Sequence, residues 1–186
     1  AYTKLESFNA ELEEQVKIRT SELLLSKEKV EESEKKFKTI FKEAPNGIAL
    51  IDSKSSYIYE VNPMFAKIVG RTIEKTKNID WMSITHPDDI KSDLESQALL
   101  YNGEINGYQL EKRYIKPDGS IVWVNLTIAA LNANGFEAKQ HLAMIEDITD
   151  RKQKDEQIRK LSRAVEQSPA SVVITDVNGD IEYVNP

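Results

Sequence analysis

The side chains best suited to chemistry in this sequence are two histidines and many carboxylates, because its 186 residues include no cysteine. Without cysteine, disulfides, thiolate metal sites and thiol nucleophiles are excluded. His86 stands before Pro87 and two aspartates, a pattern typical of the residue that precedes a helix. His141 shares strand parity with Ala143 and Ile145. We therefore expect it to point inward, as a hydrogen-bonded core residue or as a polar group in a pocket.

Neither histidine predicts a cofactor. One of the two would have to be the axial ligand of a haem, and both fit ordinary structural roles better, so haem is not expected. The carboxylates gather in HPDD and EDITD, where helices are expected to start, and no repeated acid-histidine spacing marks a metal site. The stretch GRTIEKTKN lacks the glycine spacing and the Lys-Ser/Thr ending of a phosphate-binding loop. We assign no catalytic residue and no metal site, and expect any catalysis outside this segment.

The overall charge argues against a nucleic-acid partner. The formal net charge is -6, whereas nucleic-acid binders carry basic faces. The longest mostly apolar run, residues 121–131, is much shorter than the roughly 20 residues that a membrane helix needs. The first residues lack the basic cluster and apolar stretch of a signal peptide. We therefore predict a cytoplasmic segment without membrane contact, whose parent protein could be anchored elsewhere.

The elements that would position these side chains begin with a long helix. Residues 1–42 contain no glycine or proline and are rich in Glu, Lys, Leu and Ser, the composition of an exposed helix. A seven-residue repeat places two series on one seam: Asn9, Val16, Leu23, Val30 and Phe37, and Leu5, Leu12, Arg19, Ser26, Ser33 and Ile40. Because the second series is half polar, the seam predicts a parallel coiled-coil homodimer of modest stability. The alternative is a single amphipathic helix that lies on its own domain.

Residues 43–149 are predicted to form one α+β domain. Strands are expected where apolar residues run or alternate between turn signals, and helices where proline follows a capping residue. The expected strands are 48–52, 57–61, 108–116, 120–131 and 139–147, the helices are 63–69 and from 87 onward, and two of the turns are 117–119 and 132–135. In the strand 120–131 one face carries Val122, Val124, Leu126 and Ile128.

A repeat relates the start of this domain to the end of the chain. EAPNGIALIDS at 43–53 aligns with QSPASVVITDV at 167–177, and VNP occurs at 61–63 and again at 184–186. The sequence therefore predicts a tandem array. Its parts are a signalling helix over 1–42, a domain over 43–149, a linker helix over 150–167 and the truncated start of a second domain over 168–186. Two strands cannot bury a core, so the last part is expected to add little independent stability.

The ordered set APNGIALID, VNPMFAKIVG, HPDD, YIKPDGSIVWV and IEDITDRKQ resembles the PAS, or sensory-box, family over about residues 43–152. The resemblance implies a PAS fold, a five-stranded antiparallel sheet with helices over one face and a pocket between them. The walls of that pocket would be Phe65, Ile68, Val124, Leu126, Ile128, His141, Ala143 and Ile145. For the apolar members of this set, plain core packing is the alternative.

The resemblance also implies a function. In related domains the DIT motif, here Asp147, Ile148 and Thr149, couples movement of the sheet to the outgoing helix, although an ordinary helix cap would use the same residues. Photoreceptor members need a cysteine, so thiol-dependent flavin or chromophore photochemistry is excluded in this segment. We expect a non-catalytic module of a multi-PAS sensor histidine kinase in a two-component phosphorelay, which senses a small molecule or a partner. The alternatives are a diguanylate cyclase or phosphodiesterase as the output, and a dimerisation spacer that senses nothing.

Overall fold

The computed structural model describes residues 2–52, 55–131 and 140–186, with side chains from residue 11 onward. The chain divides into two compact units, Ala1–Ala44 and Pro45–Pro186. The first unit is one helix, α1 (Tyr2–Glu43), which ends before Pro45 and whose described side chains are almost all exposed. Within the described ranges, no helix combines the length and the apolar character needed to cross a membrane.

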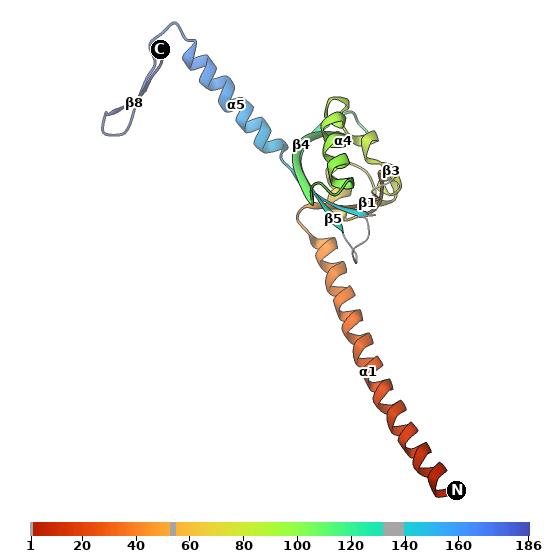
Figure 1. Ribbon diagram of the computed structural model, residues 1–186. Helices are drawn as coiled ribbons and strands as arrows, with labels where there is room; N and C mark the ends of the chain where they lie inside the picture. The colour runs from red at the N-terminus through yellow and green to blue at the C-terminus, as the bar shows by residue number, and fades with distance from the viewer. Residues whose placement is uncertain (1, 53–54, 132–139) are drawn as a thin grey trace. The chain divides into compact units, whose positions relative to one another are not determined.

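The second unit contains an antiparallel sheet in the order β3-β2-β1-β6-β5-β4 (Figure 1). Its strands are β1 (Gly47–Asp52), β2 (Tyr57–Val61), β3 (Ile79–Asp80), β4 (Gly107–Ile115), β5 (Ile121–Leu131) and β6 (Gln140–Asp147). The predicted α+β class is confirmed. The sheet has six strands and not five, because the two residues of β3 pair with β2, and so short a strand leaves no periodicity to detect. The turn predicted at 132–135 lies outside the described residues.

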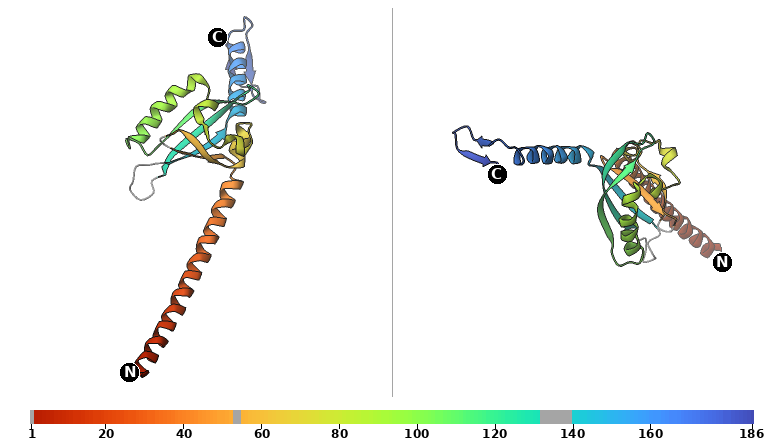
Figure 2. Two further views of the ribbon diagram at one scale, coloured as in Figure 1. Left: turned by 90° about the vertical axis from the view of Figure 1, so that its right-hand side faces the viewer. Right: turned by 90° about the horizontal axis from the view of Figure 1, so that it is seen from above.

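Helical segments connect β2 to β4 and cover one face of the sheet (Figure 2). They are α2 (Pro63–Ile68), α3 (Ile73–Thr76), the 3-10 helix η1 (Trp81–Ile84) and α4 (Pro87–Tyr101). Alternation along β5 buries four residues against them, each at most 5% exposed: Val122, Val124, Leu126 and Ile128. Their neighbours Ile121 and Trp123 lie on the outer face. The predicted inner face of this strand is therefore confirmed.

The start of α2 is fastened to β1 by Asn62, which is fully buried. Its Oδ1 accepts hydrogen bonds from the amides of Ile48 at 2.8 Å and Phe65 at 2.9 Å. Its Nδ2 donates to the carbonyl of Asn46 at 2.9 Å, and its backbone amide donates to the carbonyl of Ile48 at 3.0 Å. Pro63 follows at the first helical position, where no donor is needed.

Three of these four hydrogen bonds recur at Asn185, in the second copy of the motif. Its Oδ1 accepts from the amide of Val172 at 2.7 Å, its amide donates to the carbonyl of Val172 at 3.1 Å, and its Nδ2 donates to the carbonyl of Ala170 at 3.1 Å. This copy follows α5 (Thr149–Glu166) and contains β7 (Val173–Thr175) and β8 (Ile181–Val184). Among the described strands, these two pair only with each other, and their side chains are exposed. The sequence repeat is thus also a repeat of local structure.

Candidate functional site

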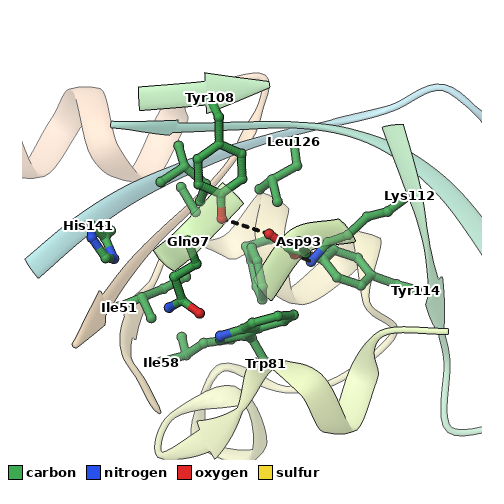
Figure 3. A pocket seen from close by; sticks show the side chains of 13 residues that line it. Ile51, Ile58, Trp81, Asp93, Gln97, Tyr108, Lys112, Tyr114, Leu126 and His141 are labelled. Carbon is green, nitrogen blue, oxygen red and sulfur yellow. Dashed lines mark hydrogen bonds and ion pairs between the residues drawn. The ribbon is translucent and has the colours of Figure 1, made fainter. Parts of the chain in front are cut away.

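A small cavity lies between the inner face of the sheet and the helical segments (Figure 3). A water-sized sphere has about 20 Å³ of space in it, which is room for about one water molecule. Most of its wall is apolar or aromatic: Ile51, Ile58, Phe65, Trp81, Tyr114, Leu126, Ile128 and Ala143. Polar side chains complete the lining: Asp93, Gln97, Tyr108, Lys112 and His141.

Five of the eight residues predicted for the pocket line this cavity: Phe65, Leu126, Ile128, His141 and Ala143. The other three, Ile68, Val124 and Ile145, are at most 6% exposed and pack in the core without lining it. Strand parity says which face of a sheet a residue occupies. It does not say which part of that face meets a cavity, and this limits the prediction.

The cavity contains a buried ion pair that sequence analysis missed. Lys112 Nζ on β4 lies 2.5 Å from Asp93 Oδ2 on α4, and these residues are 1% and 2% exposed. Tyr108 Oη donates to Asp93 Oδ1 at 2.7 Å, and Lys112 Nζ donates to Thr85 Oγ1 at 3.3 Å. One signal was present in the sequence. Lys112 has the same parity as the inward-facing Tyr108 and Tyr114, so a cation stands at a core position.

The ammonium group of Lys112 also lies against two aromatic rings. It is 4.6 Å from the ring centroid of Trp81 and 4.8 Å from that of Tyr114, within the range of a cation–π interaction. Burial lowers the pKa of Lys112, and the Asp93 carboxylate opposes this shift. Burial and the same carboxylate raise the pKa of Tyr108, so its hydroxyl stays protonated and can donate. The pair therefore adds no net charge to the cavity.

Two further polar groups face the cavity. Burial lowers the pKa of His141 below 6.5, with Asp52 opposing the shift, so its imidazole is neutral at pH 7. Gln97 lies four residues after Asp93 on the same face of α4 and is half-buried. Figure 3 shows its amide pointing into the cavity towards Trp81. Within the part of the chain that the structure describes, no group of three or more His, Asp or Glu side chains could hold a metal ion.

His86 has the structural role expected of it. It is the N-cap of α4, where its Nδ1 accepts a hydrogen bond from the amide of Asp88 at 3.3 Å. The first turn of the same helix also contacts β4, because Arg113 binds Asp89 through Nε at 2.9 Å and through a terminal nitrogen at 2.6 Å. This interaction lowers the pKa of Asp89. Successive turns of α4 thus hold successive residues of β4, through Asp89 and Asp93.

At the junction from β6 to α5, the residues expected to cap the helix make different hydrogen bonds. Ile148 stands at the N-cap position, is 3% exposed and has no side-chain cap, while Asp147 Oδ1 accepts from the amide of Thr149 at 2.9 Å. Thr149 does not cap the helix, because its Oγ1 accepts from the amide of Trp123 on β5 at 3.0 Å. The amide of Ile148 donates to the carbonyl of Trp123 at 2.9 Å. Hydrogen bonds to Trp123 of β5 therefore fix the start of α5, which we call the exit helix.

A second connection joins the first turn of α5 to β4. Glu111 Oε1 lies 2.6 Å from a terminal nitrogen of Arg151, and Glu111 Oε2 pairs with Lys152 Nζ. The hydrogen bond from Lys152 is the main reason that the pKa of Glu111 lies below its ordinary value. Lys152 Nζ also lies 5.0 Å from the ring centroid of Trp123. The exit helix thus contacts the outer face of β4 and β5, two of the strands whose inner faces line the cavity.

The chain matches known protein families in two places. Residues 45–150 match a PAS domain model, and residues 159–186 match a second PAS domain model. The probable diguanylate cyclase DgcE of Escherichia coli is 26% identical over 136 residues, which are 73% of this chain and 12% of that protein. The sensor histidine kinase TmoS of Ectopseudomonas mendocina is 26% identical over 142 residues, 76% of this chain and 14% of that protein. The chain thus spans about one eighth of the length of these relatives.

Solved structures share the fold. A sensory box histidine kinase/response regulator from Burkholderia thailandensis aligns with a TM-score of 0.56 at 23% identity, over 71% of this chain and 98% of that chain. The PAS domain of a protein from Colwellia psychrerythraea aligns with a TM-score of 0.57 at 19% identity, over 63% of this chain and 98% of that one. A third structure is the PAS domain of a LuxR-family transcriptional regulator from Burkholderia thailandensis, in complex with ethanol. It aligns with a TM-score of 0.50 at 19% identity, over 60% of this chain and 96% of that chain.

Proposed function

The chain belongs to the PAS domain family, and from this premise we propose that it is a regulatory input module. In this proposal residues 43–149 sense a small molecule or a partner, and the signal leaves through the linker helix 150–167. Residues 1–42 are the signalling helix, and residues 168–186 begin a second PAS domain, in agreement with the second family match. The segment itself is non-catalytic, and its output domain lies elsewhere in the parent protein.

One observation carries the proposal: neighbouring residues of β4 face the cavity and the exit helix. Lys112 points inward to Asp93, and the adjacent Glu111 points outward to Arg151 and Lys152. A ligand that prefers one position of β4 would therefore also change the contacts of α5. Surface ion pairs contribute about 0.2–1 kcal/mol each. Ion pairs this weak can shift the equilibrium between two states of similar free energy, but they cannot hold β4 and α5 in one fixed arrangement.

The signalling helix supports a homodimer as the partner in this proposal. Seam residues of α1 are exposed in the single chain, with Val16, Leu23 and Phe37 at 58%, 71% and 61%. An apolar stripe of this kind is stable when a second helix covers it. A parallel coiled coil of two α1 helices would bury the stripe and bring together two copies of the chain, as a dimeric output domain needs.

The output that we propose is a histidine kinase acting in a two-component phosphorelay. Similarity to TmoS favours this output, and similarity to DgcE favours a diguanylate cyclase. A spacer that senses nothing is a second candidate function. It is favoured by the small size of the cavity and by the mutual pairing of Asp93 and Lys112. The similar PAS domain that was solved in complex with ethanol supports the sensory reading over the spacer, because it shows that a domain of this fold can bind a small molecule.

The test compares two charge-neutralising variants in the full-length parent protein. Glu111→Gln breaks the ion pairs between β4 and α5, whereas the control Glu156→Gln breaks ion pairs with Arg159 and Lys160 within α5 only. Autophosphorylation and cyclic di-GMP synthesis are measured for each. We expect Glu111→Gln to change one of these outputs by about threefold or more, because 1 kcal/mol is a factor of about five. Equal outputs for wild type and both variants would support the spacer.

A further inference from the structure

The cavity offers free hydrogen-bonding capacity at one neutral side chain, and its charged groups are already paired. We propose that it binds a compact neutral molecule that carries both a donor and an acceptor, such as a small amide, and that Gln97 recognises this molecule. The inference rests on the proposed sensory function and names the class of ligand. It follows from charge, from hydrogen-bonding capacity and from size.

Charge excludes ions as the preferred ligand. The carboxylate of Asp93 and the ammonium of Lys112 neutralise each other in a buried space, so a charged ligand would leave one buried charge without a partner. An anion would have to compete with Asp93 for Lys112. A cation would be repelled by the Lys112 ammonium, which already lies against the rings of Trp81 and Tyr114.

Hydrogen-bonding capacity points to Gln97. Its amide has one acceptor and two donors. Among the described residues, no hydrogen bond of Gln97 is present, although the side chain lines the cavity. Tyr108, by contrast, already donates to Asp93. A ligand amide has the same donors and acceptor as Gln97, so the two groups can form a pair of hydrogen bonds without any change of charge.

Size restricts the ligand to a few heavy atoms. The free space is about 20 Å³, and displacing one water molecule gives little more room. Gln97 is only half-buried, so a change of its rotamer can widen the cavity at this edge. The apolar part of the ligand would lie against Ile58 and Leu126, which line the wall.

The experiment uses acetamide, acetate and acetamidinium, which share one planar heavy-atom frame and differ in net charge. Each is titrated into the 186-residue chain, and methyl NMR spectra record Ile51, Ile58, Leu126 and Ile128, which line the cavity. We expect saturable shifts with acetamide, with a dissociation constant in the millimolar range as suits so few atoms. The two ions should bind at least about tenfold more weakly, because each leaves a buried charge unpaired.

Matched leucine variants test the role of Gln97. Gln97→Leu should weaken acetamide binding about tenfold, since its hydrogen bonds are lost, while Gln153→Leu on the exposed surface of α5 should not change it. The proposal is overturned if acetate or acetamidinium binds as well as acetamide, if Gln97→Leu binds like wild type, or if acetamide does not bind at all. The last result would leave the coupling of β4 to α5 intact, because the output of Glu111→Gln measures that separately.

Discussion

Replacing Asp93 by asparagine would remove one charge of the buried pair and keep the shape of the side chain. Lys112, which is 1% exposed, would be left with Thr85 at 3.3 Å and two aromatic rings. An uncompensated buried charge of this kind costs about 3–5 kcal/mol. Since the free energy of unfolding of a domain is about 5–15 kcal/mol, the Asp93→Asn variant should still fold but lose a large part of this free energy.

A double variant measures the interaction energy between Asp93 and Lys112 apart from the cost of changing each residue alone. Lys112→Met leaves the buried Asp93 with Tyr108 as its hydrogen-bond partner among the described residues, so this variant should lose a similar amount of unfolding free energy. Asp93→Asn combined with Lys112→Met removes both charges. We expect it to lose at least about 2 kcal/mol less than the sum of the two single losses, because groups in direct contact are coupled.

Urea unfolding followed by tryptophan fluorescence measures these values, because Trp81 and Trp123 both lie in the second unit and report on it and not on α1. The control is the pair Lys91–Glu95 on the same helix, at 4.0 Å and largely exposed. Its coupling should be about 0.5 kcal/mol or less. If the coupling between Asp93 and Lys112 is no larger than that, the reasoning about the buried pair is refuted.

Three further predictions concern pH and the repeated motif. The hydrogen bond from Arg113 holds the pKa of Asp89 below 3.8. The ionised Asp89 therefore stabilises the fold above that pH, and this stabilisation is lost as the pH falls through the folded-state pKa. Asp89→Asn should make the free energy of unfolding depend less steeply on pH in acid, and an unchanged slope would contradict this. Burial lowers the pKa of His141 below 6.5, so the imidazole binds a proton more tightly in the unfolded chain. The free energy of unfolding should therefore fall as the pH drops below 6.5. An NMR titration of His141 with a midpoint above 6.5 would contradict this. Asn62→Ala should lower the free energy of unfolding in urea by about 2–4 kcal/mol, because several buried hydrogen bonds are lost. Asn185→Ala removes the corresponding bonds to Val172 and Ala170 from a hairpin outside the main sheet. It should change the unfolding of the main domain by less than about 0.5 kcal/mol, and equal losses would show that the hairpin belongs to the core.

Much of the fold could be predicted because its signals are local. Alternation along 120–131 identified the buried face of β5, and the Asn62-Pro63 pair marked the start of α2. Internal similarity located the second copy, whose Asn185 repeats three of the hydrogen bonds of Asn62. The strand β3 was missed, because its two residues depend on pairing with β2 and carry no pattern of their own.

The site was predicted less well, because it depends on contacts between distant segments. Parity placed His141 and Leu126 on the inner face, but the cavity also needs α4, whose side chains reach it only in the folded domain. Asp93 looks like an ordinary helix carboxylate until Lys112 is found beside it. The role of Thr149 was predicted in part: it lies at the helix start, yet it binds Trp123 on β5 and does not cap α5.

The most direct test of the account is hydrogen exchange at the start of α5 when the cavity is perturbed. The amide of Ile148 donates to Trp123 and that of Lys152 donates to Ile148, so both report on the junction. Asp93→Asn should speed their exchange by at least about threefold relative to the amides of β1, and this excess should disappear when Glu111→Gln is added. An excess that persists without Glu111, or no excess in either background, would contradict the claim that β4 transmits changes in the cavity to the exit helix.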